Sequence, residues 1–324
     1  MPFSAAKQHW QKENMRLLLI MGKNRRINMK EYKSCFVPLL IGTVLSVSMG
    51  LTIWVGLFFV FIPVGLSMSI GSFLSIRYNN QDLGRKISLS AISLVFLVFL
   101  GTMQRENMQI EETVIYIAYF ISTGIFTRVL IHYSVAKVFG PLIWGRGFCG
   151  WACYTAALLE WLPIKENKAI PKKFTYIRIP VLIVSLLIPF ILIQSGYDYY
   201  AGHIDSSINS HFVESRKLDQ FIWFLAGYIS YYIIGIILAF VFRKKRAFCK
   251  IFCPVSLIMK LPARIALIKV RPGENKCIQC GKCNEVCPMD IDVKKYIMNG
   301  QKILSTECIL CGNCKKKCPA KAIA

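Results

Sequence analysis

The sequence is poor in charged residues, and acidic residues are the scarcest. Charged residues make up 18% of the 324 residues, whereas ordinary soluble proteins have about a quarter. Asp and Glu number 17 against 40 Lys and Arg, which gives a formal charge of +23. The chain has no c-type haem motif, flavin-attachment motif, nucleotide fingerprint or DNA-binding motif, and no basic stretch interleaved with aromatics in a polar setting. We therefore expect no nucleic-acid partner and no complete catalytic pathway within this chain.

Apolar residues dominate what is present. Hydrophobic residues make up 55% of the chain and the mean hydropathy is +0.47. Residues 35–76 are apolar over about twice the ~20 residues that one membrane-spanning helix needs, so they predict a tight helical hairpin. Four further apolar runs follow, at 87–103, 113–131, 179–196 and 220–242. The sequence predicts an all-α polytopic membrane protein with about six transmembrane helices, followed by a small C-terminal α+β domain.

The distribution of Lys and Arg predicts the orientation in the membrane. Basic residues gather in 1–34, 77–86, 163–178 and 243–324, whereas 104–112 and 197–219 hold few. Because positively charged loops stay in the cytoplasm, both termini are expected there, in a bacterial-type inner membrane. A polar, basic stretch precedes the first apolar run, so no signal peptide is expected.

Basic residues also lie near the inner end of the predicted fourth span, at Arg128, and just after it. Arg128, His132 and Lys137 are expected to form a basic helix end that reaches the lipid headgroups. The alternative is a contact with a quinone or with the cofactor of a partner protein.

Eight of the thirteen cysteines lie between Cys277 and Cys318 in short repeated spacings, which is typical of thiolate ligands in a reducing compartment. Residues 277–288 and 308–319 both match the run C-x2-C-x2-C-x3-C-P of bacterial ferredoxins. Three thiolates spaced in this way can wrap three corners of a cubane. Structural zinc in two four-cysteine knuckles is the alternative, but zinc sites normally separate two C-x2-C pairs by a longer loop.

The ferredoxin resemblance implies how the cysteines divide, because in two-cluster ferredoxins the cysteine before Pro ligates the other cluster. Carried onto this sequence, the resemblance implies two [4Fe–4S] clusters. Their ligands would be Cys277, Cys280, Cys283 and Cys318 for cluster I, and Cys308, Cys311, Cys314 and Cys287 for cluster II.

A second cysteine pattern occurs twice at an offset of 100 residues. Arg146-Gly-Phe-Cys-Gly-Trp-Ala-Cys153 and Arg246-Ala-Phe-Cys-Lys-Ile-Phe-Cys253 match at Arg, Phe and both cysteines. On a helix, cysteines at i and i+4 share a face, so the two pairs are expected to form a joint four-thiolate site with a redox or metal role. The alternative is that they only pack between helices. We call Cys149, Cys153, Cys249 and Cys253 the repeat cysteines.

Taken together, these elements resemble the NapH and MauN type of membrane polyferredoxin, with relatives in nitrous-oxide reductase maturation and cytochrome oxidase assembly. The resemblance covers roughly residues 113–324, and the repeat cysteines match the family motif. The chain departs from the family at Tyr154, where Pro usually follows the first Cys-x3-Cys. The resemblance implies electron transfer between the quinone pool and partner redox proteins through cytoplasmic iron–sulfur clusters.

We therefore expect three parts. These are a cytoplasmic segment at 1–34, a transmembrane domain at 35–265 with Cys-x3-Cys elements at 146–163 and 246–262, and a ferredoxin domain at 266–324. An electron carrier is favoured over a stand-alone enzyme. The expected partners are the membrane, an acidic ferredoxin or flavodoxin, other subunits of a membrane redox complex, and a quinone. The alternatives are a quinol dehydrogenase or metal-ion reductase using the repeat cysteines, and an iron–sulfur sensor or assembly factor.

Overall fold

The structure is a computed structural model that describes residues 35–52, 58–103, 109–124, 126–196, 212–213 and 218–324. The predicted segment 1–34 lies outside these residues. The chain divides into two compact units, Met1–Ser88 and Leu89–Ala324, and each has its own packing. Helices dominate both units.

The first unit is built on a pair of packed helices. Helix α3 (Val37–Thr52) packs against α4 (Phe58–Arg77), and α5 (Gln81–Leu94) begins in the same unit. The helices approach closely at two glycines: a Cβ on Gly42 would lie 2.5 Å from a carbonyl oxygen of α4, and a Cβ on Gly65 would lie 2.7 Å from a carbonyl oxygen of α3. Small residues at a helix contact are typical of membrane helices. The apolar run 35–76 thus contains two helices that pack together, as the sequence predicts.

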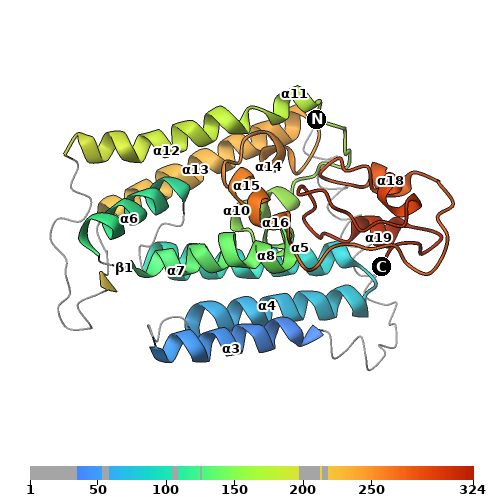
Figure 1. Ribbon diagram of the computed structural model, residues 1–324, viewed down its shortest axis with the longest axis horizontal. Helices are drawn as coiled ribbons and strands as arrows, with labels where there is room; N and C mark the ends of the chain where they lie inside the picture. Colours follow the sequence, from blue (N-terminus) through green and yellow to red (C-terminus); the bar gives the residue numbers. More distant parts are fainter. Residues whose placement is uncertain (1–34, 53–57, 104–108, 125, 197–211, 214–217) are drawn as a thin grey trace, which may run out of the picture. The chain divides into compact units, whose positions relative to one another are not determined.

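The second unit contains three long helical segments. Helix α5 continues as the π-helix η2 (Val95–Met103), and the other two are α12 (Arg178–Gln194) and α13 (Leu218–Val241). Helix α6 (Ile110–Thr123) packs along α12, and both run beside α13 (Figure 1). The aliphatic residues on the outer faces of α12 and α13 are largely exposed, which suits a hydrocarbon environment.

Short elements connect these segments. After α6 come β1 (Phe126–Thr127), α7 (Arg128–Ser134), η3 (Val135–Phe139), α8 (Gly140–Trp144), α9 (Gly147–Trp151), α10 (Tyr154–Glu160) and α11 (Lys172–Thr175). The two-residue strand β2 (Phe212–Val213) pairs in parallel with β1. After α13 come α14 (Ala247–Ile251), α15 (Val255–Ile258) and α16 (Lys260–Ala263). Ile170, Ala247 and Ile251 form a buried apolar cluster that anchors α14.

Four helical segments among the described residues are long and apolar enough to cross a membrane: Phe59–Arg77, Gln81–Met103, Lys172–Gln194 and Phe221–Val241. Two shorter apolar segments are Val37–Ser48 and Val129–Trp144.

The predicted span 113–131 is not one helix. Helix α6 ends at Gly124, whose φ of 73° lies in the left-handed region that terminates helices. A new helical run starts at Arg128 and continues to Trp144. The assignment of 104–112 to a loop is also wrong at its end, because Glu111 and Glu112 form the first turn of α6.

The ferredoxin segment, residues 266–324, contains three short helices, α17 (Lys282–Glu285), α18 (Val293–Met298) and α19 (Asn313–Lys317). An antiparallel bridge joins Pro272 to Ile323, and Arg271 and Ala324 exchange backbone hydrogen bonds of 3.4 and 2.8 Å. The pairing brings the two ends of the segment together, although no full strand forms among its residues.

Candidate iron–sulfur site

The first set of ferredoxin cysteines lines one small cavity. Cys277, Cys280, Cys283 and Cys318 all contribute to it, together with Gly281, Lys294, Ile297, Ala322 and Ile323. The structure thus brings together the three cysteines of the first motif and the last cysteine of the second, which lies 35 residues beyond Cys283 in sequence (318 − 283). This is the grouping that the ferredoxin resemblance implies for cluster I.

The second set lies close enough for its thiols to interact electrostatically. Cys287, Cys308, Cys311 and Cys314 affect one another in this way. Burial, together with the neighbouring cysteines, raises the pKa of Cys308 to about 11 and that of Cys314 to about 12. Iron binds thiolates, so cluster binding at this set must release protons.

The two motifs have the same backbone conformation at an offset of 31 residues. Gln279 and Leu310 have φ of 58° and 51°, and Gly281 and Gly312 have φ of 74° and 73°. The helices α17 and α19 begin at equivalent positions directly after these glycines. The chain therefore turns in the same way around both cysteine sets.

Backbone N–H groups donate to the last cysteine of each motif. Ile291 N lies 3.4 Å from Cys287 Sγ, and Ala322 N lies 3.3 Å from Cys318 Sγ, again at an offset of 31. Hydrogen bonds of this kind stabilise negative charge on sulfur and tune an iron–sulfur centre.

All cysteines that the structure describes are free thiols. No group of three or more His, Cys, Asp and Glu within the described residues is placed to hold a single metal ion. A cubane has its four ligands around a cluster rather than around one ion, so four free thiols around a cavity, as in the first set, fit the cubane better than zinc. The residues present fit the group.

The repeat cysteines share another cavity, but they are not arranged on helix faces as expected. Helix α9 ends at Trp151, and Cys153 precedes α10 in an extended conformation. In the second copy, Cys253 likewise lies outside α14. The i, i+4 expectation is wrong because each helix ends between its two cysteines. All four thiols nevertheless line one cavity.

The walls of this cavity combine cations, aromatics and sulfur. Cys149 Sγ lies 3.7 Å from Met259 Sδ, and Lys137 Nζ lies 3.6 Å above the Phe148 ring. Lys137 is 4% exposed and His132 is 2% exposed, so the expectation that they reach the headgroups is wrong for both residues. Tyr154, which replaces the usual Pro, also lines the cavity and packs edge-on against Tyr228. Buried cation–π contacts of this kind compensate for the lost hydration of the ammonium group.

The two repeat arginines are fully buried and bind different carboxylates. Arg246 Nε donates to Glu160 Oε1 at 2.6 Å, whereas Arg146 Nη1 pairs with Glu307 of the ferredoxin segment. Burial alone would lower the pKa of Arg146, but Cys149 and Glu307 raise it above its ordinary value, and Arg146 also interacts with Cys308. Arg146 thus stands between the repeat cysteines and the second ferredoxin set.

Two carboxylates attach the ferredoxin segment to the rest of the unit. Glu307 accepts from Arg178 at 2.8 Å and from Lys260 at 2.5 Å, in addition to Arg146. Burial alone would raise the pKa of the Glu307 carboxyl, but Arg146 and Arg178 hold it well below its usual range.

Asp290 is bound in the same way on the other side of the second set. It accepts from Lys244 at 2.5 Å, from Lys250, and from the backbone N–H of Ile170 at 3.1 Å. Burial alone would raise its pKa, but Lys244 and Lys250 hold it below the usual range. Asp290 follows Cys287 by three residues and Glu307 directly precedes Cys308, so both anchors flank cysteines of the second set.

The backbone of the second motif also touches the first repeat element directly. Trp151 Nε1 donates to the Leu310 carbonyl oxygen at 3.0 Å. A Cβ on Gly150 would lie only 2.1 Å from the Ile309 carbonyl oxygen, so this contact requires glycine.

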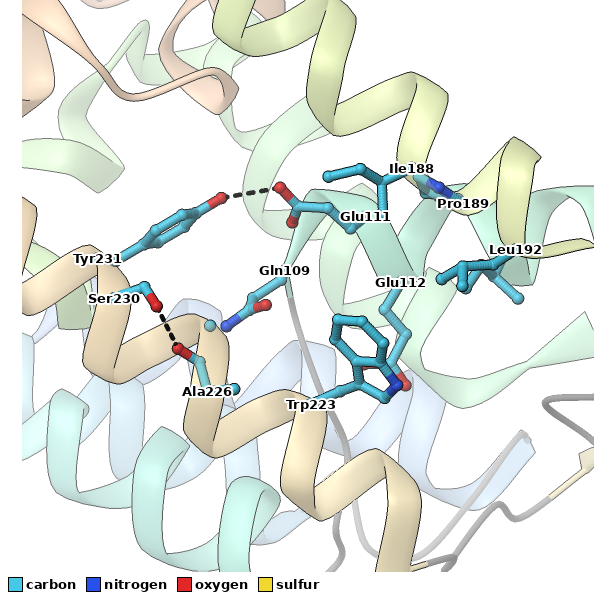
Figure 2. Close-up of a pocket in the computed structure, with 12 residues that line it drawn as sticks. Gln109, Glu111, Glu112, Ile188, Pro189, Leu192, Trp223, Ala226, Ser230 and Tyr231 are labelled. Carbon is cyan, nitrogen blue, oxygen red and sulfur yellow. Dashed lines mark hydrogen bonds between the residues drawn. The ribbon is translucent and has the colours of Figure 1, made fainter. Parts of the chain in front are cut away.

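A further cavity of about 230 Å³ lies between α6, α12 and α13. Figure 2 shows Glu111 and Glu112 at the cavity on α6, and Trp223 and Tyr231 on α13. Tyr231 Oη donates to Glu111 Oε1 at 3.0 Å, and the other oxygen, Oε2, is buried without a hydrogen bond among the described residues. Gln109 and Tyr231 line both this cavity and that of the repeat cysteines, so the two cavities share a wall.

The residues of the cavity between α6, α12 and α13 were not identified from the sequence. In the sequence, Glu111 and Glu112 look like part of a polar loop, because their surroundings depend on α6 packing along α12. The anchoring roles of Asp290 and Glu307 were also missed. A signal was present, since the equivalent positions of the other motif carry Lys321 and Lys276.

Comparison with protein families gives two matches. Residues 269–319 match a 4Fe-4S dicluster domain. Residues 134–171 and 226–273 match a 4Fe-4S binding domain, and each of these segments contains one pair of repeat cysteines. No solved structure matches the chain.

Three curated relatives are weakly similar. "Uncharacterized protein MJ0749" of Methanocaldococcus jannaschii is 25% identical over 218 residues, which cover 58% of this chain and 76% of that protein. "Uncharacterized protein MJ0750" of the same organism is 26% identical over 57% of this chain and 82% of its own length. "Putative electron transport protein YccM" of Escherichia coli is 27% identical over 50% of this chain and 47% of its own length. Together with the two domains, these matches support an iron–sulfur electron-transport family for this chain.

Proposed function

We propose that this chain is a membrane-embedded electron-transfer protein of the NapH and MauN type that holds two [4Fe–4S] clusters. The observation that carries the proposal is the repeated geometry of the ferredoxin segment, in which two sets of four free thiols lie within the same backbone turns. The matches to two 4Fe-4S domains support it independently. Bound clusters would each accept or donate one electron.

The residues of the chain position and tune these centres. Cys277, Cys280, Cys283 and Cys318 would hold cluster I, and Cys287, Cys308, Cys311 and Cys314 would hold cluster II. Asp290 and Glu307 fix the second set against the repeat elements. The repeat cysteines, which line one cavity, would hold a further redox or metal centre.

The proposed topology has six crossings with both termini in the cytoplasm. The four long apolar segments supply four crossings, and α3 and the run from Arg128 to Trp144 supply the other two. In this arrangement α6 enters the membrane and ends within it. The outer aliphatic faces of α12 and α13 support the membrane assignment.

Anaerobic purification tests the cofactor assignment. We expect about eight irons per chain and electron paramagnetic resonance signals of two interacting cubanes after reduction. Replacing Cys280 by Ser is expected to remove the first centre, and replacing Cys311 by Ser the second. Zinc in place of iron, or an iron content in either variant equal to that of the native chain, would refute the proposal. Iron above eight that disappears in a Cys149→Ser, Cys249→Ser variant would establish a third centre.

A second candidate function is quinol oxidation at the cavity beside Glu111. Three observations favour it: the cavity is mostly apolar, its rim residues Ile188 and Trp223 are 40% and 42% exposed toward the proposed lipid phase, and Oε2 of Glu111 has no hydrogen bond within the part of the chain that the structure describes. A carboxylate placed in this way can accept a proton as a quinol is oxidised. Tyr231 forms part of the wall toward the repeat cysteines, and a redox-active metal or cluster held by these cysteines would supply the electron acceptor.

Oxidation of a soluble quinol analogue by the purified protein tests this candidate. We expect iron reduction in the native chain and its loss in the Cys149→Ser, Cys249→Ser variant, while dithionite still reduces both proteins. Full activity of that variant would exclude the repeat cysteines from the path. Reduction of a metal ion in place of quinol oxidation would favour a metal-ion reductase.

A further inference from the structure

The two ferredoxin motifs are related by an offset of 31 residues, but their surroundings differ. The face of the second motif, formed by Glu307, Ile309 and Asp290, is docked on the rest of the chain. Ile309 is 2% exposed and its carbonyl oxygen packs onto Gly150. This face is therefore covered by other residues of the same chain.

The equivalent face of the first motif is formed by Lys276, Ile278 and Lys321. Backbone geometry supports the equivalence, since Asp290 and Lys321 have φ of 54° and 52°. Ile278 is 62% exposed where Ile309 is buried. The same surface shape is therefore repeated, open to solvent, with its apolar centre uncovered.

The charges on the two faces are opposite. Where the docked face has Glu307 and Asp290, the open face has Lys276 and Lys321, and both lysines are exposed. The docked face is acidic and binds basic residues of this chain, so the open face is suited to an acidic surface of another molecule. A second copy of the chain cannot supply that surface from its own docked face, because its Glu307 and Asp290 are already bound.

We propose that the face formed by Lys276, Ile278 and Lys321 is the docking site for an acidic soluble redox protein. This inference rests on the proposed electron-transfer function and names the partner side of it. Cys280 is the exposed member of the first cysteine set and lies at this face, two residues from Ile278. The first set is thus the side of the chain that exchanges electrons with the partner, and the second set is the side that faces the repeat cysteines.

The composition of the face suits a transient complex. An exposed isoleucine surrounded by lysines gives an apolar contact with a charged rim, and the rim charges mainly set the association rate and its salt dependence. Such a surface permits rapid binding and release, as an electron carrier requires.

Binding of a purified acidic flavodoxin to the full-length protein in detergent tests the inference. The test variant is Lys276→Glu with Lys321→Asp, which copies the charges of the docked face onto the open one. The control is Lys165→Glu with Lys172→Glu, which makes the same change in net charge at exposed positions outside the ferredoxin segment. We expect the test variant to weaken binding about tenfold, and the control to leave the dissociation constant within about twofold.

A change of the apolar side chain at position 278 complements the charge test. Ile278→Ser should weaken binding without changing its salt dependence, and a photo-crosslinking residue at position 278 should label flavodoxin. Equal weakening by the test and control pairs, no effect of the test pair, or cross-linking of position 278 to lipid alone would overturn the docking site.

Iron content and the visible spectrum of every variant separate this inference from the proposed function. A native chain without iron would refute the function whether or not flavodoxin binds. A chain with about eight irons whose test variant binds flavodoxin normally would refute the docking face alone.

Discussion

Arg246 donates a hydrogen bond from its Nη1 to the backbone carbonyl oxygen of Cys149 at 2.7 Å, across 97 residues of chain. The arginine of the second repeat element thus holds the first cysteine of the other element in place. Its Nε binds Glu160 at 2.6 Å, and both side chains are buried. This ion pair is what keeps the two cysteine pairs on one cavity.

Replacing Arg246 by Met should therefore be strongly destabilising. It leaves the Glu160 carboxylate buried without its cation, which typically costs about 3–5 kcal/mol. The Arg246→Met, Glu160→Met double variant should recover a large part of this loss, because both charges of this buried pair are then removed. The matched control is Arg243→Met, since Arg243 and Glu166 form an exposed pair at 3.1 Å worth about 0–1 kcal/mol. Thermal unfolding in detergent measures all four proteins, and a double variant less stable than the single one would contradict the ion-pair account.

Replacing Glu307 by Gln should loosen the ferredoxin segment. Arg146 and Arg178 would lose their carboxylate while remaining buried, at a cost of about 3 kcal/mol. Hydrogen exchange of residues 305–310 should accelerate. Glu285→Gln, which alters an exposed carboxylate of the same segment, is the control and should change nothing.

The same carboxylate predicts a pH dependence. Its folded-state pKa is depressed, so its stabilisation is complete above the ordinary Glu pKa of about 4.3 and is lost as pH falls toward the lower folded-state value. Unfolding of the native chain should become easier over that acidic range. The Glu307→Gln variant should show a smaller change there, and an identical pH profile for the two proteins would contradict the assignment.

Local patterns carried most of what could be predicted. The ferredoxin resemblance implied how the cysteines divide, and in the structure Cys277, Cys280, Cys283 and Cys318 line one cavity. The 100-residue repeat predicted that Cys149, Cys153, Cys249 and Cys253 would meet, although the local helix geometry was wrong. The run 35–76 was long enough to require two helices.

Features that depend on long-range packing could not be predicted in this way. The break at Gly124 lies inside a continuous apolar run, so hydropathy gives no sign of it. Glu111 is polar in sequence and lies beside an apolar cavity only because α6 packs along α12. The opposite charges of Lys276 and Glu307 are visible in the sequence, but their meaning depends on which motif is docked.

A Gly150→Ala variant tests the direct contact between the first repeat element and the second ferredoxin motif. In Gly150→Ala the new Cβ would lie 2.1 Å from the Ile309 carbonyl oxygen, so the ferredoxin segment must shift, at a cost of about 1–3 kcal/mol. Gly235→Ala is the control, because its Cβ would meet only the Leu159 methyl groups, at 3.2 and 3.3 Å. Limited proteolysis of the segment should accelerate in the first variant and not in the second. Equal cleavage rates would show that this contact does not fix the segment.

Variants of Glu111 test the cavity between α6, α12 and α13 separately from the clusters. Glu111→Gln removes the proposed proton acceptor and should slow oxidation of a quinol analogue by about 10²-fold, the lower end of the range for general bases. Tyr231→Phe should give a smaller loss, because it removes only the 3.0 Å hydrogen bond that orients the carboxylate. Ser230→Ala is the matched control: Ser230 lines the same cavity, but its hydroxyl donates to the Ala226 carbonyl of its own helix at 2.7 Å (Figure 2). Electron exchange with flavodoxin should stay unchanged in all three variants, since the docking face lies in the ferredoxin segment. A Glu111→Gln variant that oxidises the quinol analogue at the native rate would remove the carboxylate from the reaction and leave the cavity without a chemical role.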